Sequence, residues 1–524
     1  MMKKSLILLL MLLSFFGAAA QNVTVAVFSL NDFHGAFLRD DRKNIKGAAA
    51  VAQTLRNLQE LYPYNVTVSA GDNFGGSYFY NVTKGRTLPL FFQTAGIELS
   101  AVGNHEFDDG LVKLADKWSK WRPEGWNLKY VCANVTEKAT GKIPSYFQPT
   151  AIVSIPLSET KQIKVGFVGL ATSNTPFQVS SGKVDALSFN GDYTSVVNQY
   201  KSEIADADIR LLLMHVGTNM KDGAPIWADR DSANISSFND RDFHGLLTGH
   251  SHEAVVGTIN SNDYPVVQGH WHGNYINIIR FTVDTVAMRV LKAEPEIISV
   301  NENIRLDDTC KRFEAVCDSL VRHTKVGGYN MDQVIGTIEE EIIHDRSDKY
   351  KKTKIGEAVC RAYAETVREK GGFGKNEPII GLSHFGSIRS GFPKGTLRVI
   401  DAGETLPFEN TLCPFYISGR VLKELVSYGF HNMKYGWLQT GWLKIETDAN
   451  QNVKRLIIQT PGGKNIKVKD NGKYIFVVDS YMAGGGDGYD KKYFDPENKL
   501  KIDGLPVTTG AFIDYLIRNK AKID

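Results

Sequence analysis

The sequence predicts an α/β fold divided between two unlike domains. Over roughly the first three hundred residues, short β-rich runs alternate with helical patterns, which is typical of a layered α/β domain. A helical pattern from Asp307 to His323, followed by Gly327 and Gly328, separates this part from a region of β-like runs and glycine-rich turns. The length of 524 residues also exceeds what one hydrophobic core normally spans.

Hydrophobic spacing predicts the elements of the first region in order. Val23–Leu30 and Val66–Ala70 are β-rich runs and are expected to form strands. Between them, Gly47–Leu61 places apolar residues three or four positions apart, which predicts a helix with one buried face. Three later strands are expected at Lys164–Leu170, Arg210–Met214 and Tyr275–Val283.

The second region opens with another helical pattern, at Ile355–Arg368. β-like runs follow it, so we expect a second, smaller α/β domain there. Its clearest strands are Trp442–Glu446, Val453–Gln459 and Tyr474–Val478.

The first twenty residues have the layout of a secretory signal peptide. Lys3 and Lys4 precede an apolar run, Leu6–Leu13, and the small residues Ala18–Ala20 end the segment. The run is too short for a good membrane span, and no later stretch is apolar over a sufficient length. We therefore expect cleavage after Ala20 and a secreted, periplasmic protein without a transmembrane segment.

Composition and charge exclude several classes of protein. Apolar residues make up 42% of the chain and charged residues 23%, which is the balance of a folded globular protein. Loss of the signal segment lowers the formal net charge from +3 to +1, so charge gives no reason to expect a nucleic acid polymer or an anionic membrane as partner. The five cysteines are too few for a disulfide scaffold, and Cys310 and Cys317 lie about 10 Å apart on the predicted helix, beyond disulfide reach.

Polar motifs rich in metal-ligand side chains end five apolar runs of the first region. They are Asn31–Gly35, Gly71–Asn73, Gly103–Asp108, His215 and Gly249–His252. In an α/β sheet, ligands bind beyond the carboxyl ends of the strands, so these motifs are expected to meet. Aspartate, imidazole and amide ligands without thiolates suit borderline divalent ions such as Zn²⁺, Mn²⁺ or Fe²⁺. Five such motifs in order therefore predict a metal site.

This series of motifs resembles that of the calcineurin-like metallophosphoesterases. Asn31–Gly35, Gly103–Asp108 and motifs of the second region are similar to those of the secreted 5'-nucleotidases, which include the periplasmic UDP-sugar hydrolases. The resemblance implies an N-terminal layered metallophosphoesterase β-sandwich flanked by helices, and a smaller α/β C-terminal substrate-binding domain. The implied parts are a signal peptide at 1–20, a calcineurin-like metallophosphoesterase domain at 21–303, a helical linker at 304–330 and a nucleotide-binding domain at 331–524.

The resemblance also implies two divalent metal ions, zinc, manganese or similar. The seven implied ligands are Asp32, His34 and His252 for the first ion, Asn104, His215 and His250 for the second, and Asp72 as the bridge. In the implied mechanism, a metal-activated hydroxide attacks the phosphorus while His105 acts above the scissile phosphate and Asp108 fixes its tautomer. His270 and His272 match no motif of the family, and we expect them to be loop residues.

Motifs of the second region resemble the family's substrate-binding part. Ser383–Arg389 lies where the family carries Asn-x-Gly-x-Ile-Arg, and Ser480–Tyr489 resembles its glycine-rich loop. Two aromatic rings on opposite loops can sandwich a base. The implied substrate-binding residues are Arg389 for phosphate, Trp437 and Tyr481 for the base, Asp487 for ribose hydroxyls and His384 near the base.

Two positions depart from the family pattern. His384 replaces an asparagine near the base, and residues 350–354 offer lysines where an arginine is expected. Lysine neutralises phosphate without the rigid bidentate fork of arginine. The hydrolytic chemistry is therefore better defined than the substrate.

The leading hypothesis is a secreted dinuclear-metal phosphohydrolase of nucleotide catabolism that converts 5'-nucleotides to nucleoside and phosphate. UDP-sugar pyrophosphatase and 2',3'-cyclic nucleotide phosphodiesterase activities are alternatives on the same site. An exported nucleotide-binding protein without turnover is an alternative from another class, and the complete ligand set argues against it. The preferred base, the physiological metal, the oligomeric state and the extent of any domain rotation stay open.

Overall fold

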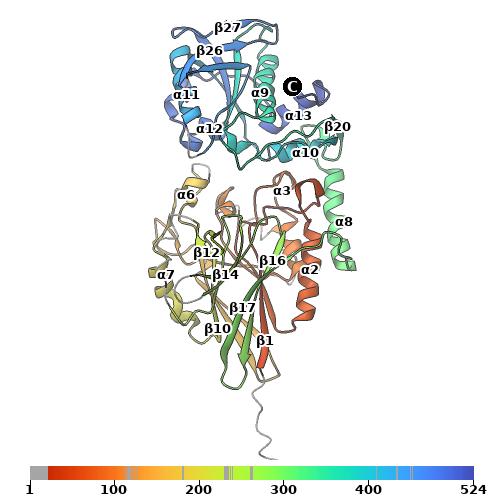
Figure 1. Ribbon diagram of the computed structural model, residues 1–524, viewed down its shortest axis with the longest axis vertical. Helices are drawn as coiled ribbons and strands as arrows, with labels where there is room; N and C mark the ends of the chain where they lie inside the picture. The colour runs from red at the N-terminus through yellow and green to blue at the C-terminus, as the bar shows by residue number, and fades with distance from the viewer. Residues whose placement is uncertain are drawn as a thin grey trace, which may run out of the picture. The chain divides into compact units, whose positions relative to one another are not determined.

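The computed structural model divides into two compact units (Figure 1). The first unit comprises residues 1–75 and 85–315, and the second comprises 76–84 and 316–524. The structure describes residues 22–111, 114, 120–121, 123–124, 127–179, 182–228, 235, 238, 240–259, 264–408, 410–431, 435–448, 450 and 452–523. The signal peptide predicted at 1–20 lies outside the described residues.

Seven strands form the first sheet of the first unit. Their order is β17 (Arg289–Ser299), β16 (Tyr275–Asp284), β1 (Asn22–Leu30), β2 (Asn65–Ser69), β3 (Leu99–Ala101), β4 (Lys129–Val131) and β6 (Phe147–Gln148). Strands β1, β2, β3 and β4 run parallel, whereas β16 pairs antiparallel with β1. The carboxyl ends of β1, β2 and β3 therefore lie at the same edge of the sheet.

Six strands form the second sheet of this unit. Their order is β14 (Ala254–Ile259), β15 (Tyr264–Gly269), β13 (Gly245–Leu247), β10 (Ile209–His215), β8 (Gln162–Ala171) and β7 (Thr150–Pro156), and β8, β10, β13 and β15 run parallel. Val25 and Val27 of β1 share one buried cluster with Phe167 of β8 and with Leu211 and Leu213 of β10. The two sheets therefore pack face to face through alternate side chains, and the predicted layered α/β class is confirmed.

Helices flank this sandwich, and Figure 1 shows α2 (Ala48–Leu61) and α7 (Tyr193–Tyr200) outside its strands. α2 begins after Gly47, whose φ of 81° is a conformation that glycine adopts without strain. Val196 and Val197 of α7 share a second cluster with Leu212 and Met214 of β10, whose side chains alternate with those of the sandwich core. The predicted first helix and the strands predicted between 23 and 283 are confirmed within a few residues.

The second unit contains a larger and a smaller sheet. The larger has the order β23 (Leu412–Ser418), β28 (Lys473–Asp479), β21 (Ile379–Ser383) and β24 (Gln439–Gly441), and the smaller β25 (Leu443–Thr447), β26 (Val453–Gln459) and β27 (Asn465–Lys467). Ile379 of β21 packs in one cluster with α9 (Lys354–Lys370) and α13 (Thr508–Arg518). The next residue, Ile380, packs in another with α11 (Gly419–His431). The larger sheet is thus covered on both faces, and the predicted second α/β region is confirmed.

Two helices mark where the chain passes between the units. α8 (Asp308–His323) matches the helix predicted from Asp307, and it contains both Ala315, the last residue of the first unit, and Val316. α3 (Tyr78–Thr83) belongs to the second unit although its neighbours in sequence belong to the first, which the sequence did not indicate. All five cysteines are buried and free, so Cys310 and Cys317 are not bonded to each other, as predicted. Within the described residues, no helix combines the length and apolar character needed to span a membrane.

Candidate metal centre

The predicted metal ligands lie at the carboxyl ends of parallel strands in the first unit. They are Asp32 and His34 after β1, Asp72 after β2, Asn104 after β3, His215 at the end of β10, and His250 and His252 after β13. Three strands come from one sheet and two from the other, so the site forms where both sheets present the same edge. Parallel pairing aligns the strand ends within each sheet, and the packing of the two sheets brings together residues that are more than two hundred positions apart in sequence.

Ligand atoms of six of these residues, together with His105, fall into three overlapping groups. Within each group the atoms lie within 4.8 Å of one another, and the groups are Asp32, His34 and His252, then His34, Asp72 and His105, and finally Asp72, His215 and His250. In the first group, Nε2 of His34 lies 2.9 Å from Nε2 of His252, which lies 3.3 Å from Oδ1 of Asp32. Such convergence of nitrogen and carboxylate oxygen atoms is the arrangement that a cation requires.

Two buried polar atoms of the centre indicate whether its residues could bind a metal ion. Among the described residues, Nε2 of His215 and Oδ1 of Asn104 have no hydrogen-bond partner. Nδ1 of His215 donates to the carbonyl oxygen of Ala70 at 2.9 Å, so Nε2 faces Oδ2 of Asp72 at 3.1 Å. Burial lowers the pKa of His215, but the charge of Asp72 outweighs burial and raises that pKa to about 10, so a proton or a metal ion is favoured between the two atoms. Two acceptors this close repel each other unless a positive charge lies between them. The donor set therefore fits divalent metal ions.

Charge and burial favour the ligand forms of these side chains. Burial alone would raise the pKa of Asp72, but the charges of His215 and His105 outweigh it and hold that pKa well below its usual range. Burial and the neighbouring His252 lower the pKa of His34 well below its usual value, so its imidazole is neutral. An ionised carboxylate beside a neutral imidazole is what metal coordination needs.

The backbone of the centre is strained. Five of the seven predicted ligands have left-handed φ angles: 49° for Asp32, 49° for His34, 52° for Asp72, 83° for His250 and 61° for His252. Non-glycine residues in this region cost about 1 kcal/mol or more each and persist only where the surroundings impose them. The strain is therefore concentrated where the side chains converge, and spacing in the sequence did not reveal it.

Glu106 is a residue of the centre to which the sequence assigned no role. Its buried carboxylate accepts hydrogen bonds from the backbone N–H groups of Asp72 at 2.9 Å, Asn73 at 2.8 Å and Gly103 at 2.7 Å. Burial, with the charge of Asp72, raises its pKa to about 7. Glu106 thereby ties the loop after β2 to the loop after β3. Its place inside the predicted Gly103–Asp108 motif was the only available signal.

The predicted catalytic pair is in contact. Nδ1 of His105 lies 2.7 Å from Oδ2 of Asp108, and the backbone N–H of His105 donates to Oδ1 of Asp72 at 2.9 Å. His105 is thus oriented by one carboxylate and anchored beside a predicted bridging ligand. Gln178, which the sequence did not single out, lies with its Nε2 3.1 Å from Nε2 of His250. His270 and His272 lie in the loop after β15 and belong to none of the three groups found among the described residues.

Three of the predicted substrate-binding residues form one network in the second unit. Nδ1 of His384 lies 2.8 Å from Oδ2 of Asp487, and the hydroxyl of Tyr481 donates to Oδ1 of the same carboxylate at 3.1 Å. The rings of His384 and Tyr481 lie 4.9 Å apart, tilted by 33°. His384, which departs from the family pattern, is therefore an ionic partner of the residue predicted to bind ribose.

The other two contact rings outside this network, although the charge of Arg389 helps that of His384 to lower the pKa of Asp487 against the effect of burial. The ring of Trp437 packs on Phe430 with centroids 5.1 Å apart, and the guanidinium of Arg389 lies over the ring of Phe408 at 5.2 Å. In the lysine-rich segment 350–354, Lys351 forms ion pairs with Asp345 and Asp348. Lys351 is thus already paired with carboxylates.

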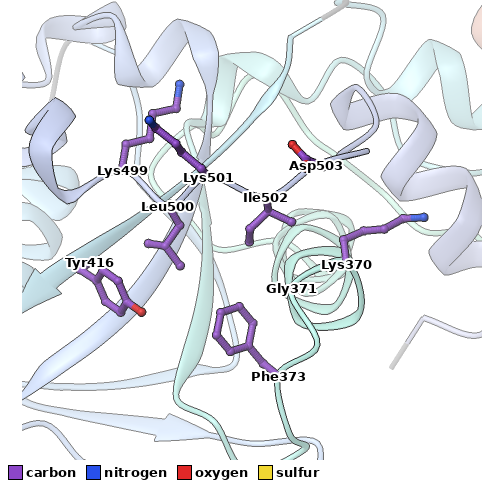
Figure 2. A pocket seen from close by; sticks show the side chains of 9 residues that line it. All are labelled: Lys370, Gly371, Phe373, Tyr416, Lys499, Leu500, Lys501, Ile502 and Asp503. Atoms are coloured by element: carbon purple, nitrogen blue, oxygen red, sulfur yellow. The ribbon is translucent and has the colours of Figure 1, made fainter.

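A cavity of about 620 Å³ in the second unit contains none of the predicted residues. Figure 2 shows its lining, in which Leu500 and Ile502 point toward the rings of Phe373 and Tyr416. Lys499 and Lys501 alternate with them and point the opposite way (Figure 2). The lining thus combines apolar and charged side chains, and the cavity adds nothing to the metal centre.

Comparisons with known proteins agree with this geometry. Residues 334–493 match the family model of the 5'-nucleotidase C-terminal domain. The snake venom 5'-nucleotidase of Gloydius brevicauda is 23% identical over 530 residues, which cover 92% of this chain and 84% of that protein. The 5'-nucleotidase of Bos taurus is also 23% identical, with coverages of 96% and 90%. The solved 5'-nucleotidase precursor of Thermus thermophilus shares the fold, with a TM-score of 0.72 at 21% identity over 95% of this chain and 97% of that chain.

Proposed function

We propose that the chain is a hydrolase of the 5'-nucleotidase family, acting on phosphoric monoesters, and that it converts 5'-nucleotides to nucleoside and phosphate; the family-model match and the 5'-nucleotidase relatives support this proposal. The observation that supports the proposal most is the convergence of buried acceptor atoms in the first unit. Nε2 of His215 and Oδ1 of Asn104 are buried without a hydrogen-bond partner, and Nε2 of His215 lies 3.1 Å from Oδ2 of Asp72, an arrangement that a divalent cation would satisfy.

The proposed ligand sets follow the strand ends. Asp32, His34 and His252 would hold one divalent ion, Asn104, His215 and His250 another, and Asp72 would contact both. When bound, such a pair of ions polarises the phosphate, lowers the pKa of a water molecule and stabilises the entering and leaving oxygens of an in-line displacement. Glu106 would hold the loop that carries Asp72 against the loop that carries Asn104.

His105 and Asp108 would move the proton. The contact with Asp108 fixes the imidazole so that Nδ1 faces the carboxylate and Nε2 faces away from it. In that tautomer, Nε2 of a protonated His105 can give its proton, or its positive charge, to the leaving oxygen. The side chain of His105 is 16% exposed, so solvent can restore the proton after each turnover.

The second unit would recognise the nucleoside. Tyr481 and Trp437 offer aromatic faces to a base, Arg389 offers a guanidinium to phosphate, and Asp487 offers a carboxylate to ribose hydroxyls. UDP-sugars and 2',3'-cyclic nucleotides are alternative substrates of the same centre. We also propose export of the mature chain, which the signal-like layout of residues 1–20 supports.

The test is phosphate release by the purified chain with added Mn²⁺ or Zn²⁺. AMP should release phosphate, UDP-glucose should yield UMP if the alternative pyrophosphatase activity exists, and 2',3'-cyclic AMP should yield a monoester if the phosphodiesterase activity exists. Addition of EDTA should abolish each activity. Absence of turnover with all three substrates, in the presence of bound metal, would favour the non-catalytic nucleotide-binding alternative.

A second measurement separates base recognition from hydrolysis. Trp437→Ala should raise KM for AMP and leave the hydrolysis of a small aryl phosphate unchanged, because a stacked base contributes about 1 to 3 kcal/mol. Phe430→Leu, which changes the ring packed on Trp437, is the matched control for local packing. Equal damage to both substrates by Trp437→Ala would show that the ring is structural.

A further inference from the structure

The loop that follows β15 presents an indole ring to the metal centre. Trp271 stacks on the imidazole of His252, with ring centroids 5.0 Å apart and planes 29° apart. It also stacks on His272, at 4.2 Å and 10°. No role for Trp271 follows from the ligand set or from the His105–Asp108 pair, although the ring touches a predicted ligand directly.

The backbone around Trp271 is fixed to the loop that carries Asp32. The N–H of His272 donates to the carbonyl oxygen of Asp32 at 2.8 Å. The side chain of Asn31 donates to the carbonyl oxygen of His270 at 2.7 Å and accepts from the N–H of Gly269 at 2.7 Å. These bonds hold the indole at a set position relative to the ligands that follow β1.

The same loop carries backbone strain on both sides of the indole. His270 and His272 have φ angles of 60° and 58°, the left-handed region that costs non-glycine residues free energy. A side chain at Gly273 would meet Val51, so the loop approaches α2 too closely for a larger residue. A conformation imposed by so many contacts has little freedom to move Trp271 away from His252.

His252 needs such support more than its neighbours do. Its side chain is 36% exposed, whereas those of His34 and His215 are 5% and 0% exposed and are held by packing. A ligating histidine normally donates its second ring N–H to a carbonyl or carboxylate, as His215 does to Ala70. Within the described part of the chain, the polar contacts of the His252 ring are made by Nε2, with His34 and Asp32. The indole face therefore takes the place of the usual orienting bond at the other ring nitrogen.

We propose that Trp271 is a positioning residue for the metal ligand His252. Its ring sets the plane of the imidazole, so that Nε2 faces both Oδ1 of Asp32 and Nε2 of His34. Trp271 thereby sets the affinity of the ion site formed by Asp32, His34 and His252. The site formed by Asn104, His215 and His250 does not depend on it. The proposal rests on the proposed function in that it takes the centre to bind metal.

The experiment is calorimetric titration of the metal-free full chain with Mn²⁺, which resolves the two sites without measuring turnover. Trp271→Leu keeps apolar bulk but removes the flat face, and it should weaken one site about tenfold or more, the usual range for loss of a group that orients a ligating imidazole. The other site should stay within about twofold of the wild type. Trp271→Phe restores an aromatic face and should recover most of the affinity.

Controls separate this effect from loss of fold. Trp442→Leu, in the second unit where the ring packs on Arg361, should leave both Mn²⁺ sites unchanged. His252→Ala identifies which calorimetric step belongs to the site of His252, so the step weakened by Trp271→Leu can be assigned.

Three outcomes would overturn the proposal. The first is an unchanged Mn²⁺ affinity in Trp271→Leu, and the second is an equal loss of Mn²⁺ affinity at both sites. The third is a Trp271→Phe chain that binds Mn²⁺ as weakly as Trp271→Leu does. A wild-type chain that binds no Mn²⁺, Zn²⁺ or Co²⁺ would instead remove the proposed function together with this inference. The two failures are therefore distinguishable.

Discussion

His105 differs from the surrounding histidines in what its ring contacts. Nδ1 of His105 contacts Oδ2 of Asp108, and the His105 ring lies edge-on to the ring of His34, with centroids 5.0 Å apart. The predicted metal ligands converge on one another, whereas Nδ1 of His105 is oriented by the carboxylate of Asp108. A histidine held in this way can change its protonation state without dismantling the centre.

His105→Ala should therefore lower kcat for AMP by about 10² or more and leave two metal ions bound, following the usual magnitude of general acid catalysis. Steady-state kinetics and metal analysis of the same preparation measure both quantities. Asp108→Asn, which alters only the orienting partner, should lower kcat as well. Loss of metal from His105→Ala would contradict the assignment and make His105 a ligand.

The ionic pair of the second unit gives a pH dependence with a defined sign. Burial opposes the charged form of His384, but the charge and hydrogen bond of Asp487 outweigh it and raise the pKa of His384 above its ordinary 6.5. In the same way, the pKa of Asp487 is lowered below 3.8 by His384 despite its burial. His384 therefore stabilises the fold fully below pH 6.5, and that contribution is lost as the pH rises through its folded pKa.

Raising the pH from about 6 to about 9 should therefore lower the melting temperature of the wild type more than that of His384→Asn. Circular dichroism melts of both chains across this range provide the measurement. Asp487 adds to stability above its unfolded pKa, so the pair is strongest in mildly acidic solution. Parallel curves for the two chains would show that the pair does not contribute.

At the level of elements, the loops after β2 and β3 act as one part of the molecule. Glu106 binds the backbone of both, and a Cβ built on Gly103 would overlap Oδ1 and the backbone N of Asp72. The close approach of the two loops is thus possible only because residue 103 has no side chain. The position of Asp72 depends on a glycine that carries no ligand atom.

Gly103→Ala should displace Asp72 and reduce metal binding and kcat together, since both proposed ions share that carboxylate. Gly374→Ala is the matched control, because a Cβ there meets no atom within 4 Å. Metal titration and AMP hydrolysis of both variants test the prediction. An active Gly103→Ala chain with full metal content would show that the loops can separate without harm.

The elements of this fold were predictable where the signal is local. Strands such as β1 and β10 and the helices α2 and α8 follow from apolar spacing, and the polar motifs directly follow the strands. The contact of Trp271 with His252 and the attachment of Glu106 to the loop after β2 depend on residues far apart in sequence. The same is true of α3, whose own sequence carries no sign of the unit that it joins. Strand pairing and loop conformation determine these contacts. The spacing of apolar residues in the sequence indicates neither of them.

On the scale of the whole molecule, the two units have separate hydrophobic cores. Val27, Phe167 and Leu213 belong to a core of the first unit, and Ile379 and Phe512 to a core of the second. The predicted metal ligands all belong to the first unit. Metal binding should therefore stabilise one unit selectively.

Addition of EDTA should lower the melting transition of the first unit and leave that of the second unchanged. At a hundredfold excess over its Kd, an ion that binds only the folded state adds about 2.7 kcal/mol to the free energy of unfolding. Differential scanning calorimetry with and without Mn²⁺ measures the shift. Asp32→Asn, with one carboxylate fewer in the centre, should show a smaller EDTA effect, and equal shifts of both transitions would contradict the prediction.

The assignment of α3 to the second unit affects how the chain is made. A ribosome releases Tyr78–Thr83 long before Val316, where the rest of that unit begins, a delay of roughly 10 to 50 s at usual rates of synthesis. During this interval Tyr78, Phe79 and Tyr80, which are buried in the finished protein, have no completed core to enter. The nascent chain thus carries an aromatic segment that must be kept from aggregating until the rest of the second unit, which begins more than two hundred positions later, has been made.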